Sequence, residues 1–413
     1  MASITALIRP PRKAKPTKEH SEICSEKLIK LILKILHSFS TVLSGSLLLS
    51  SLVGCTLVLT IGTTEAAVHK TLKAPIKHKA KKKTPPKKAP EVEVNFLEWP
   101  EVQDFIDKLS AQHKFERAYL LDIFKQARKT ESAIQLVKPA PVGKPKNWKA
   151  YRARFVENGR IEAGLAFWER NLDALTRAEQ DTGVPSEIIV GLIGVETIYG
   201  KTTGSFRALD VLSTLAFAYP DTPNRESRQH FFRKELAELL LWAREQSQEL
   251  ISLKSSYAGA LGLCQFMPSS LRNFAIDFNQ DGKIDIRASE TDAIGSVANY
   301  LAKHGWKKGP ADVYPVSLIS ESIDAALLAH ALGQGLQAKL SLDQLSKLIS
   351  SAEANNIPKQ SQYGLIDLQN GDSPDEYWLV TDNFFAITHY NRSYFYAMSV
   401  IDLGKVIALA RKK

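Results

Sequence analysis

The chain has 413 residues, of which 44% are hydrophobic and 24% are charged, a composition typical of a folded protein with room for one large domain or several small ones. Its net charge of +10 arises at one end: residues 1–90 carry +13, so the residues from Glu91 onward carry −3. A mildly acidic folded part argues against a nucleic-acid partner, because such binding needs the basic patch on the domain itself.

Residues 1–67 are typical of an export signal or a membrane anchor. An apolar run from Thr41 to Gly62 follows a basic stretch, and this order predicts that the rest of the chain lies outside the cytoplasm. The box Leu52–Cys55 (LVGC) is similar to the lipidation site of bacterial lipoproteins, although the residues after Cys55 stay apolar. Cleavage near Thr64–Ala66 and an uncleaved anchor are the alternatives. We therefore expect a periplasmic, membrane-attached protein, and an outer-membrane lipoprotein if Cys55 is lipidated.

Residues 68–94 are interpreted as a basic linker. Residues 68–90 hold nine lysines and several prolines without a periodic apolar pattern, which is typical of an extended, disordered tether. Such a segment is either a spacer or, through its charge, a contact to anionic lipid or anionic wall polymer.

The part of the chain from residue 95 to residue 409 is predicted to be mainly α with a minor β component. Apolar residues recur at helical spacing in residues 102–109 and 119–124, and residues 161–182 predict one helix with Leu165, Trp168, Leu172 and Leu175 on one face. Other helices are predicted over residues 210–218, 227–246, 288–303 and 395–409. Helix-like and strand-like runs alternate in residues 312–380, which predicts a small mixed subdomain. The expected fold class is α+β, mainly α.

The segment Pro185–Gly200 (PSEIIVGLIGVETIYG) places a carboxylate deep in an apolar helix. Negative charge is favourable in the first turn, where Glu187 lies, but nothing local accounts for Glu196. A carboxylate withdrawn from water holds its proton near pH 7, as a general acid for a glycosidic oxygen must. The alternative is a structural Glu paired to an arginine or capping a helix. The glycines of this helix predict close approach of another backbone or a ligand.

Two adjoining segments carry turn-forming and polar residues. Residues 256–262 (SYAGALG) predict a tight loop, and a helix opened by Pro268 follows shortly after. Between them, Gln265 offers donors and an acceptor suited to a sugar amide or hydroxyl. Cys264 lies among apolar residues with no basic neighbour, so we expect a structural thiol rather than a nucleophile. It has no cysteine partner beyond residue 90, which excludes a disulfide within the folded part.

Residues 277–282 match the first half of a calcium-binding loop, D-x-N-x-D-G. The acid usual at position twelve is replaced by Ala288, so an enlarged loop over residues 277–292 would be needed. The expected ligands are the side chains of Asp277, Asn279, Asp281 and Asp292, the backbone carbonyl of Lys283 and, through a water, Asp285. The alternative is an ion-free turn. A bound calcium ion would be structural, and no cofactor is expected for catalysis.

Four segments together resemble the lytic murein transglycosylase B family of bacterial cell-wall enzymes. They are VGLIGVETIYG, SYAGALGLCQFMPSS, DAIGSVANYLAKHGW and ITHYNRSYFYAM, within a resemblance that extends from Phe96 to Leu409. The resemblance implies a lysozyme-like catalytic core with accessory helical and small β-containing regions. It also implies cleavage of the MurNAc–GlcNAc bond of peptidoglycan without water, leaving a 1,6-anhydro sugar. It puts the catalytic acid/base at Glu196 and substrate-groove roles on Tyr151, Ser256, Gln265, Tyr300, Tyr390 and Asn391.

A single carboxylate is sufficient for the reaction that the resemblance implies. Ordinary glycosidases use two, but Glu187 lies about 13 Å along the helix from Glu196, too far to share one bond. The sugar's own 6-hydroxyl would attack instead, with Glu196 first protonating the leaving oxygen and then taking the hydroxyl proton. Tyr300 and Tyr390 would stack on sugar faces, and core packing is the alternative for each.

Three other functions are compatible with parts of this pattern. A hydrolytic muramidase would give a product one water heavier, a wall-binding protein would keep the groove without activity, and a calcium-sensing module would move its helices on binding the ion. The expected partners are peptidoglycan glycan strands and, through the N-terminus, a membrane. We expect a monomer that binds no nucleic acid.

Overall fold

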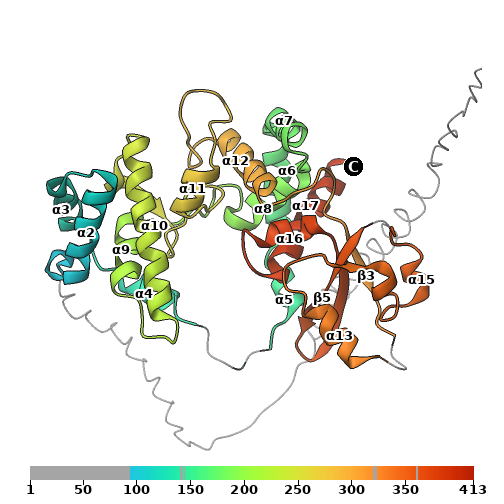
Figure 1. Cartoon of the computed structure of the whole chain (residues 1–413). Coiled ribbons are helices and arrows are strands. Elements are labelled where there is room, and N and C mark those ends of the chain that lie inside the picture. The colour runs from blue at the N-terminus through green and yellow to red at the C-terminus, as the bar shows by residue number, and fades with distance from the viewer. Residues whose placement is uncertain (1–93, 140–142, 144, 320–322, 360) are drawn as a thin grey trace, which may run out of the picture. The chain divides into compact units, whose positions relative to one another are not determined.

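The computed structural model describes residues 94–139, 143, 145–319, 323–359 and 361–413, and these belong to one compact unit of the chain, Lys87–Lys413 (Figure 1). The predicted export signal and the predicted linker up to residue 93 lie outside the described residues. Within the described ranges, none of the helices combines the length and the apolarity that crossing a bilayer requires.

Helices dominate the described residues, which confirms the mainly α prediction. The helices are η1 (Phe96–Glu98), α2 (Pro100–His113), α3 (Arg117–Lys125), α4 (Glu131–Leu136), α5 (Trp148–Arg152), α6 (Asn158–Arg170), α7 (Leu172–Thr182), α8 (Ser186–Thr197), α9 (Ala208–Phe217), α10 (Arg225–Glu245), η2 (Leu250–Ser252), α11 (Pro268–Phe274), α12 (Glu290–Lys303), α13 (Ala325–Leu332), α14 (Leu342–Leu345), α15 (Ser351–Ala354), α16 (Asp382–Thr388) and α17 (Tyr394–Arg411). The strands are β1 (Phe206–Arg207), β2 (Lys254–Ser255), β3 (Val313–Val316), β4 (Leu340–Ser341), β5 (Gln362–Asn370) and β6 (Ser373–Val380).

Helix α8 is packed by α6, α7, α12 and α17, and its closest neighbour is α17 (Figure 1). Every residue of α8 is buried except Glu187 and Glu196. A Cβ atom added at Gly191 would lie 2.2 Å from the carbonyl oxygen of Val400, and one added at Gly404 would lie 2.1 Å from that of Glu187. These glycines therefore serve the contact between the two helix backbones, one of the two uses that the sequence predicted.

The prediction of one helix over residues 161–182 is wrong, because the chain breaks at Asn171 into α6 and α7. The Asn171 side-chain amide donates to the carbonyl oxygen of Phe167 at 2.9 Å and to the carboxylate of Glu290 at 2.5 Å. Leu172, placed on the predicted apolar face, is 41% exposed. The break depends on a partner that lies 119 residues further along the chain, so local periodicity could not indicate it.

A second group of helices packs around aromatic side chains. The ring centroid of Phe105 lies 5.6 Å from that of Phe217 and 5.9 Å from that of Phe124, joining α2, α3 and α9. Helix α10 packs against both α9 and α11, and α11 in turn contacts α12. This chain of contacts connects the accessory helices to those around α8.

The larger sheet has the strand order β3-β6-β5-β4, and each neighbouring pair is antiparallel. Side chains of β5 alternate between two cores: Tyr363 and Leu365 belong to a small cluster with α13, α14 and α15, whereas Ile366 and Leu368 belong to the main core. This period of two is that of a strand buried on both faces. The sheet lies within residues 312–380, where alternating elements were predicted, and β5 contacts α5 and α17.

Candidate active site

Glu196 is the next-to-last residue of α8, and its side chain is partly exposed. Its Oε1 atom accepts a hydrogen bond from the Tyr396 hydroxyl at 2.5 Å. Burial raises the pKa of Glu196 from its ordinary value of 4.5 to about 7, although the hydrogen bond from Tyr396 acts in the opposite direction. The negative end of the helix dipole further disfavours the ionised form. The site therefore contains a carboxyl that can hold or release a proton near neutral pH.

Two polar side chains secure the end of α8 that carries Glu196. The buried Arg160 guanidinium donates to the carbonyl oxygens of Gly194 at 2.6 Å and Val195 at 3.2 Å, and a cation is favourable at this end of a helix. The Thr197 hydroxyl donates to the Leu263 carbonyl oxygen at 2.7 Å. These bonds hold the last turn of α8 against α6 on one side and against the loop before Gln265 on the other.

The backbone next to Glu196 is strained. Ile198 and Tyr199 have φ values of 53° and 56°, in the left-handed region, which a β-branched residue such as Ile198 rarely adopts. Gln265 has a φ of 50°. Backbone strain of this kind persists where the surrounding structure overdetermines it, and it is concentrated at functional sites.

Gln265 lies in a tight turn that begins at the end of the loop predicted over residues 256–262. Reciprocal backbone hydrogen bonds between Leu261 and Phe266, at 2.8 and 3.1 Å, close the turn. The Gln265 amide nitrogen donates to the carbonyl oxygens of Gly262 at 2.9 Å and Thr203 at 3.2 Å. Both amide donors are thus used within the protein, which leaves the amide oxygen as the group that can accept from a ligand.

Tyr300 and Tyr390 form an aromatic wall beside this turn. Their ring centroids are 4.8 Å apart in an edge-to-face arrangement. The Tyr300 hydroxyl donates to the His389 carbonyl oxygen at 2.8 Å, and the Tyr390 hydroxyl donates to that of Cys264. Tyr300 is 7% exposed and stacks on His304, whereas Tyr390 is partly exposed. Tyr390 can therefore present part of its ring to a ligand. The buried ring of Tyr300 packs against the ring of Tyr390.

The other predicted groove residues occupy different environments. Tyr151 of α5 is partly exposed, and burial raises its pKa; the charge of Arg154 lowers this pKa and that of Glu196 raises it. The Ser256 hydroxyl accepts from the backbone nitrogens of Ala258 and Ala260 at 3.3 and 3.1 Å, so it shapes its own loop. Asn391 is exposed and directly follows Tyr390.

Tyr396 and Arg160 are site residues that the sequence reasoning missed. Tyr396 lies 200 residues from Glu196 in the chain, and the signal that could have indicated it is the concentration of tyrosines in ITHYNRSYFYAM. Arg160 gave no signal, because an arginine in an amphipathic helix is ordinarily solvated and here the side chain is buried.

Cys264 is fully buried, and burial raises the pKa of its thiol. The thiol therefore stays protonated at neutral pH, in agreement with the structural role predicted from its apolar neighbours.

The loop over residues 277–292 is held together by its own acidic and amide side chains. Asp277 accepts from the backbone nitrogens of Asp281 and Gly282, at 3.1 and 2.8 Å. The buried Asp292 accepts from those of Phe278, Asn279 and Asp285, at 2.9 to 3.1 Å. In the described part of the chain, no three or more His, Cys, Asp or Glu side chains are grouped to hold a metal. The loop offers hard oxygen donors suited to calcium, but Asp292 already caps the loop backbone.

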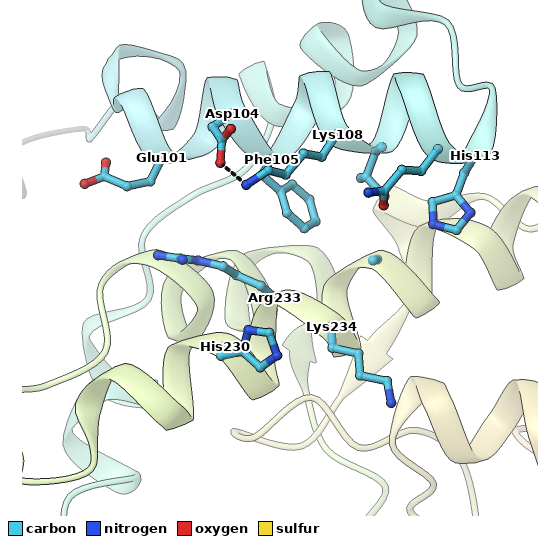
Figure 2. Close-up of a pocket in the computed structure, with 11 residues that line it drawn as sticks. Glu101, Asp104, Phe105, Lys108, His113, His230, Arg233 and Lys234 are labelled. Carbon is cyan, nitrogen blue, oxygen red and sulfur yellow. Dashed lines mark hydrogen bonds and ion pairs between the residues drawn. The ribbon is translucent and has the colours of Figure 1, made fainter.

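A cavity of about 410 Å³ between α2 and α10 contains none of these residues (Figure 2). Figure 2 shows Lys108 bonded to Asp104 along α2, at 2.6 Å, while His230, Arg233 and Lys234 project from α10. The Arg233 guanidinium donates to the Ala216 carbonyl oxygen at 3.2 Å. Two of its cations, Lys108 and Arg233, thus already have partners within the protein, and none of the predicted site residues lines this cavity.

Comparison with known proteins identifies the family of this chain. A family described as "Transglycosylase SLT domain" matches residues 98–405. Membrane-bound lytic murein transglycosylase B of Escherichia coli (strain K12) is 40% identical over 331 residues, which cover 77% of this chain and 85% of the relative.

Two crystal structures share the fold. The soluble lytic transglycosylase SltB1 from Pseudomonas aeruginosa is 40% identical, with a TM-score of 0.67 over 76% of this chain and 100% of SltB1. The Escherichia coli lytic transglycosylase Slt35 in complex with calcium is 38% identical, with a TM-score of 0.65 over 76% of this chain and 94% of Slt35. The chain therefore belongs to the SLT-domain family of lysozyme-like peptidoglycan lytic transglycosylases, which cleave the MurNAc–GlcNAc bond to leave a 1,6-anhydro end.

Proposed function

We propose that Glu196 alone supplies the acid and the base of the transglycosylase reaction. The observation that supports this is the Glu196 carboxyl, whose pKa burial raises to about 7 against the lowering effect of the hydrogen bond from Tyr396. Burial also raises the pKa of Glu187, the other acid of α8, but Lys405 and Lys412 lower it, and Glu187 has no such cationic neighbours in common with Glu196.

The reaction then proceeds in two proton transfers through one group. Protonated Glu196 donates to the glycosidic oxygen as the bond from that oxygen to the anomeric carbon breaks. The 6-hydroxyl of the same sugar attacks the anomeric carbon, and Glu196, now a carboxylate, takes the hydroxyl proton. The Tyr396 hydroxyl stabilises the carboxylate between the two steps. No water is consumed, and Glu196 ends protonated, as it began.

The groove residues have complementary roles in this proposal. The free amide oxygen of Gln265 accepts from a sugar hydroxyl or acetamide nitrogen, and the exposed part of Tyr390 packs on a sugar ring. Tyr151, which is partly exposed, and Asn391, which is exposed, contact the substrate. Ser256 and Tyr300 shape the wall, because the first is bonded to its own loop and the second is buried.

Product analysis of purified murein tests this assignment. We expect the wild type to release anhydro-muropeptides and Glu196→Gln to lose roughly a thousandfold in rate. Glu187→Gln is the matched control on the same helix, and it should retain the wild-type rate. Products one water heavier would instead identify a hydrolytic muramidase. Release unchanged in Glu196→Gln would contradict the catalytic role.

We also propose that the loop over residues 277–292 binds calcium as a structural ion. Asp277, Asn279, Asp281 and the Lys283 carbonyl would supply ligands, and Asp292 would contribute from the far side of the loop. Support comes from the D-x-N-x-D-G pattern and from the relative Slt35, which is described in complex with calcium. The ion would supply no chemistry to the proton transfers, because it would lie in the loop between α11 and α12.

We propose that the enzyme acts as a monomer in the periplasm, attached to a membrane through its N-terminal segment. Support for the membrane attachment comes from the basic and apolar pattern of residues 1–67 and from the similarity to the membrane-bound lytic murein transglycosylase B of Escherichia coli. Fatty-acid labelling and membrane fractionation of the wild type beside Cys55→Ser test lipidation. Label and membrane attachment that both persist in the variant would contradict lipidation at Cys55.

A further inference from the structure

The end of α8 passes into a turn that its own residues disfavour. Ile198, Tyr199 and Gly200 have φ values of 53°, 56° and 91°, so three successive residues lie in the left-handed region. Only Gly200 adopts this conformation without a steric penalty, because the Cβ atom of the other two crowds the following carbonyl oxygen. Strain of this kind persists only where surrounding contacts impose it. A contact outside the turn must therefore hold Ile198 and Tyr199 in place, directly after Glu196 and Thr197.

The Tyr199 side chain supplies that contact. It is 6% exposed, and its ring centroid lies 4.9 Å from that of Phe167 in α6. Its hydroxyl lies in a slot between two helices. A Cβ atom added at Gly164 of α6 would lie 2.5 Å from the hydroxyl oxygen, and one added at Gly194 of α8 would lie 2.3 Å from it. The ring fits because both helices have a glycine at this level, so its position is closely defined.

The Tyr199 side chain is held by packing rather than by hydrogen bonding. Its hydroxyl has no hydrogen-bond partner among the described residues. Burial raises the pKa of this hydroxyl, and the charge of Arg160 acts in the opposite direction. The same guanidinium donates to the carbonyl oxygens of Gly194 and Val195. The tyrosine ring, the arginine and the last turn of α8 therefore form one packed unit, which ends beside Glu196.

We propose that Tyr199 is a positioning residue that acts through Glu196. By holding the left-handed turn, its ring fixes where α8 ends and so directs the Glu196 carboxyl toward the Tyr396 hydroxyl, 2.5 Å away, and toward the glycosidic oxygen. The proposal rests on the catalytic role of Glu196 proposed above. It accounts for a strained turn and a close-packed slot beside the acid, because a displacement of about 1 Å at a reacting group can lower the rate about a hundredfold.

Replacement of the ring tests the proposal on soluble glycan strands. We expect Tyr199→Leu to lower kcat about tenfold or more and to leave KM within about twofold, because the acid moves while the groove residues stay. The pH above which kcat/KM declines should also rise, since a displaced carboxyl loses the Tyr396 bond that lowers its pKa. Tyr199→Phe keeps the ring and should retain most of kcat. The control Phe232→Leu removes a buried ring from α10 and should change neither kcat nor the pH profile.

A second pair of variants approaches the ring from α6 and decides the matter if Tyr199→Leu does not fold. Gly164→Ala places a Cβ atom against the Tyr199 hydroxyl and against the flexible end of Ile407, and it should also lower kcat. Gly164→Ala/Tyr199→Phe removes the colliding oxygen and should recover most of the lost rate.

Three results would overturn the proposal: a wild-type kcat in folded Tyr199→Leu, a wild-type kcat in Gly164→Ala, or a double variant that is no faster than Gly164→Ala. The loss of anhydro products in Glu196→Gln tests the proposed function separately, because that variant leaves the ring and its slot unchanged. If Glu196→Gln is inactive while the Tyr199 and Gly164 variants behave as the wild type does, the positioning role alone fails.

Discussion

At the scale of single residues, the proposed mechanism makes the pH range of activity depend on the protonation of Glu196. Its pKa is raised to about 7, so the acid form that starts the reaction dominates below neutrality and is lost as the pH rises through 7. We expect kcat/KM, measured from pH 5 to pH 9, to have a single descending limb near pH 7. The carboxylate needed in the second step is generated by the first, so it adds no ascending limb. A profile that rises through pH 7 would contradict the assignment.

The Tyr396 hydroxyl tunes that same carboxyl. Its hydrogen bond lowers the pKa of Glu196 against the effect of burial, so Tyr396→Phe should move the descending limb to higher pH. The rate at low pH should fall about tenfold or more, because the carboxylate formed in the first step loses a donor. Tyr219→Phe removes a tyrosine hydroxyl outside the site and should leave both the limb and the rate unchanged. A limb that stays in place in Tyr396→Phe would indicate that the hydroxyl serves packing alone.

At the scale of elements, the contact between α8 and α17 brings Glu196 and Tyr396 together. Gly404 allows the backbones to touch, since an added Cβ would meet the Glu187 carbonyl oxygen at 2.1 Å. Gly404→Ala must push the helices apart, and we expect it to lower the free energy of unfolding by roughly 1–3 kcal/mol. The activity should fall as well, because Tyr396 and Glu196 lie on these two helices. Chemical denaturation and rate measurements check both effects.

A matched glycine substitution separates this contact from helix propensity. Gly159, in the first turn of α6, would place an added Cβ 3.3 Å from the flexible carboxylate of Glu157. Gly159→Ala should therefore be neutral or stabilising by up to about 1 kcal/mol. Equal stability changes in the two variants would contradict a special role for the α8–α17 contact.

At the scale of the whole molecule, a calcium ion in the loop over residues 277–292 would brace α11 against α12. If it binds there, millimolar calcium should raise the melting temperature by a few degrees, and Asp281→Asn should abolish the increase. Asp372→Asn, in the exposed turn between β5 and β6, should behave as the wild type does. Activity should persist after the ion is removed. A rate that depends on calcium would instead favour a sensing module, and an unchanged melting temperature would contradict the site.

Local chemistry explains which features of the fold and site could be predicted from the sequence. Glu196 could be predicted because it is an acid within an apolar helix that no neighbouring residue explains. The cost of burying a carboxylate depends on its immediate neighbours, so the sequence around it is sufficient to single it out. Likewise, Pro268 starts α11 as predicted, since proline at the first helical position loses no hydrogen bond. The apolar context of Cys264 was enough to predict an inert thiol.

Contacts between distant segments determined the rest. The bond from Tyr396 to Glu196 joins residues 200 positions apart, and the break at Asn171 depends on Glu290, so neither has a local signature. Tyr300 shows the same limit, because its sequence context suits a sugar platform but packing against His304 and Tyr390 buries it. The sequence by itself determined the class of elements and the position of the acid. The tertiary structure alone decided which side chains surround that acid, because packing brings together groups whose separation along the chain has no periodicity.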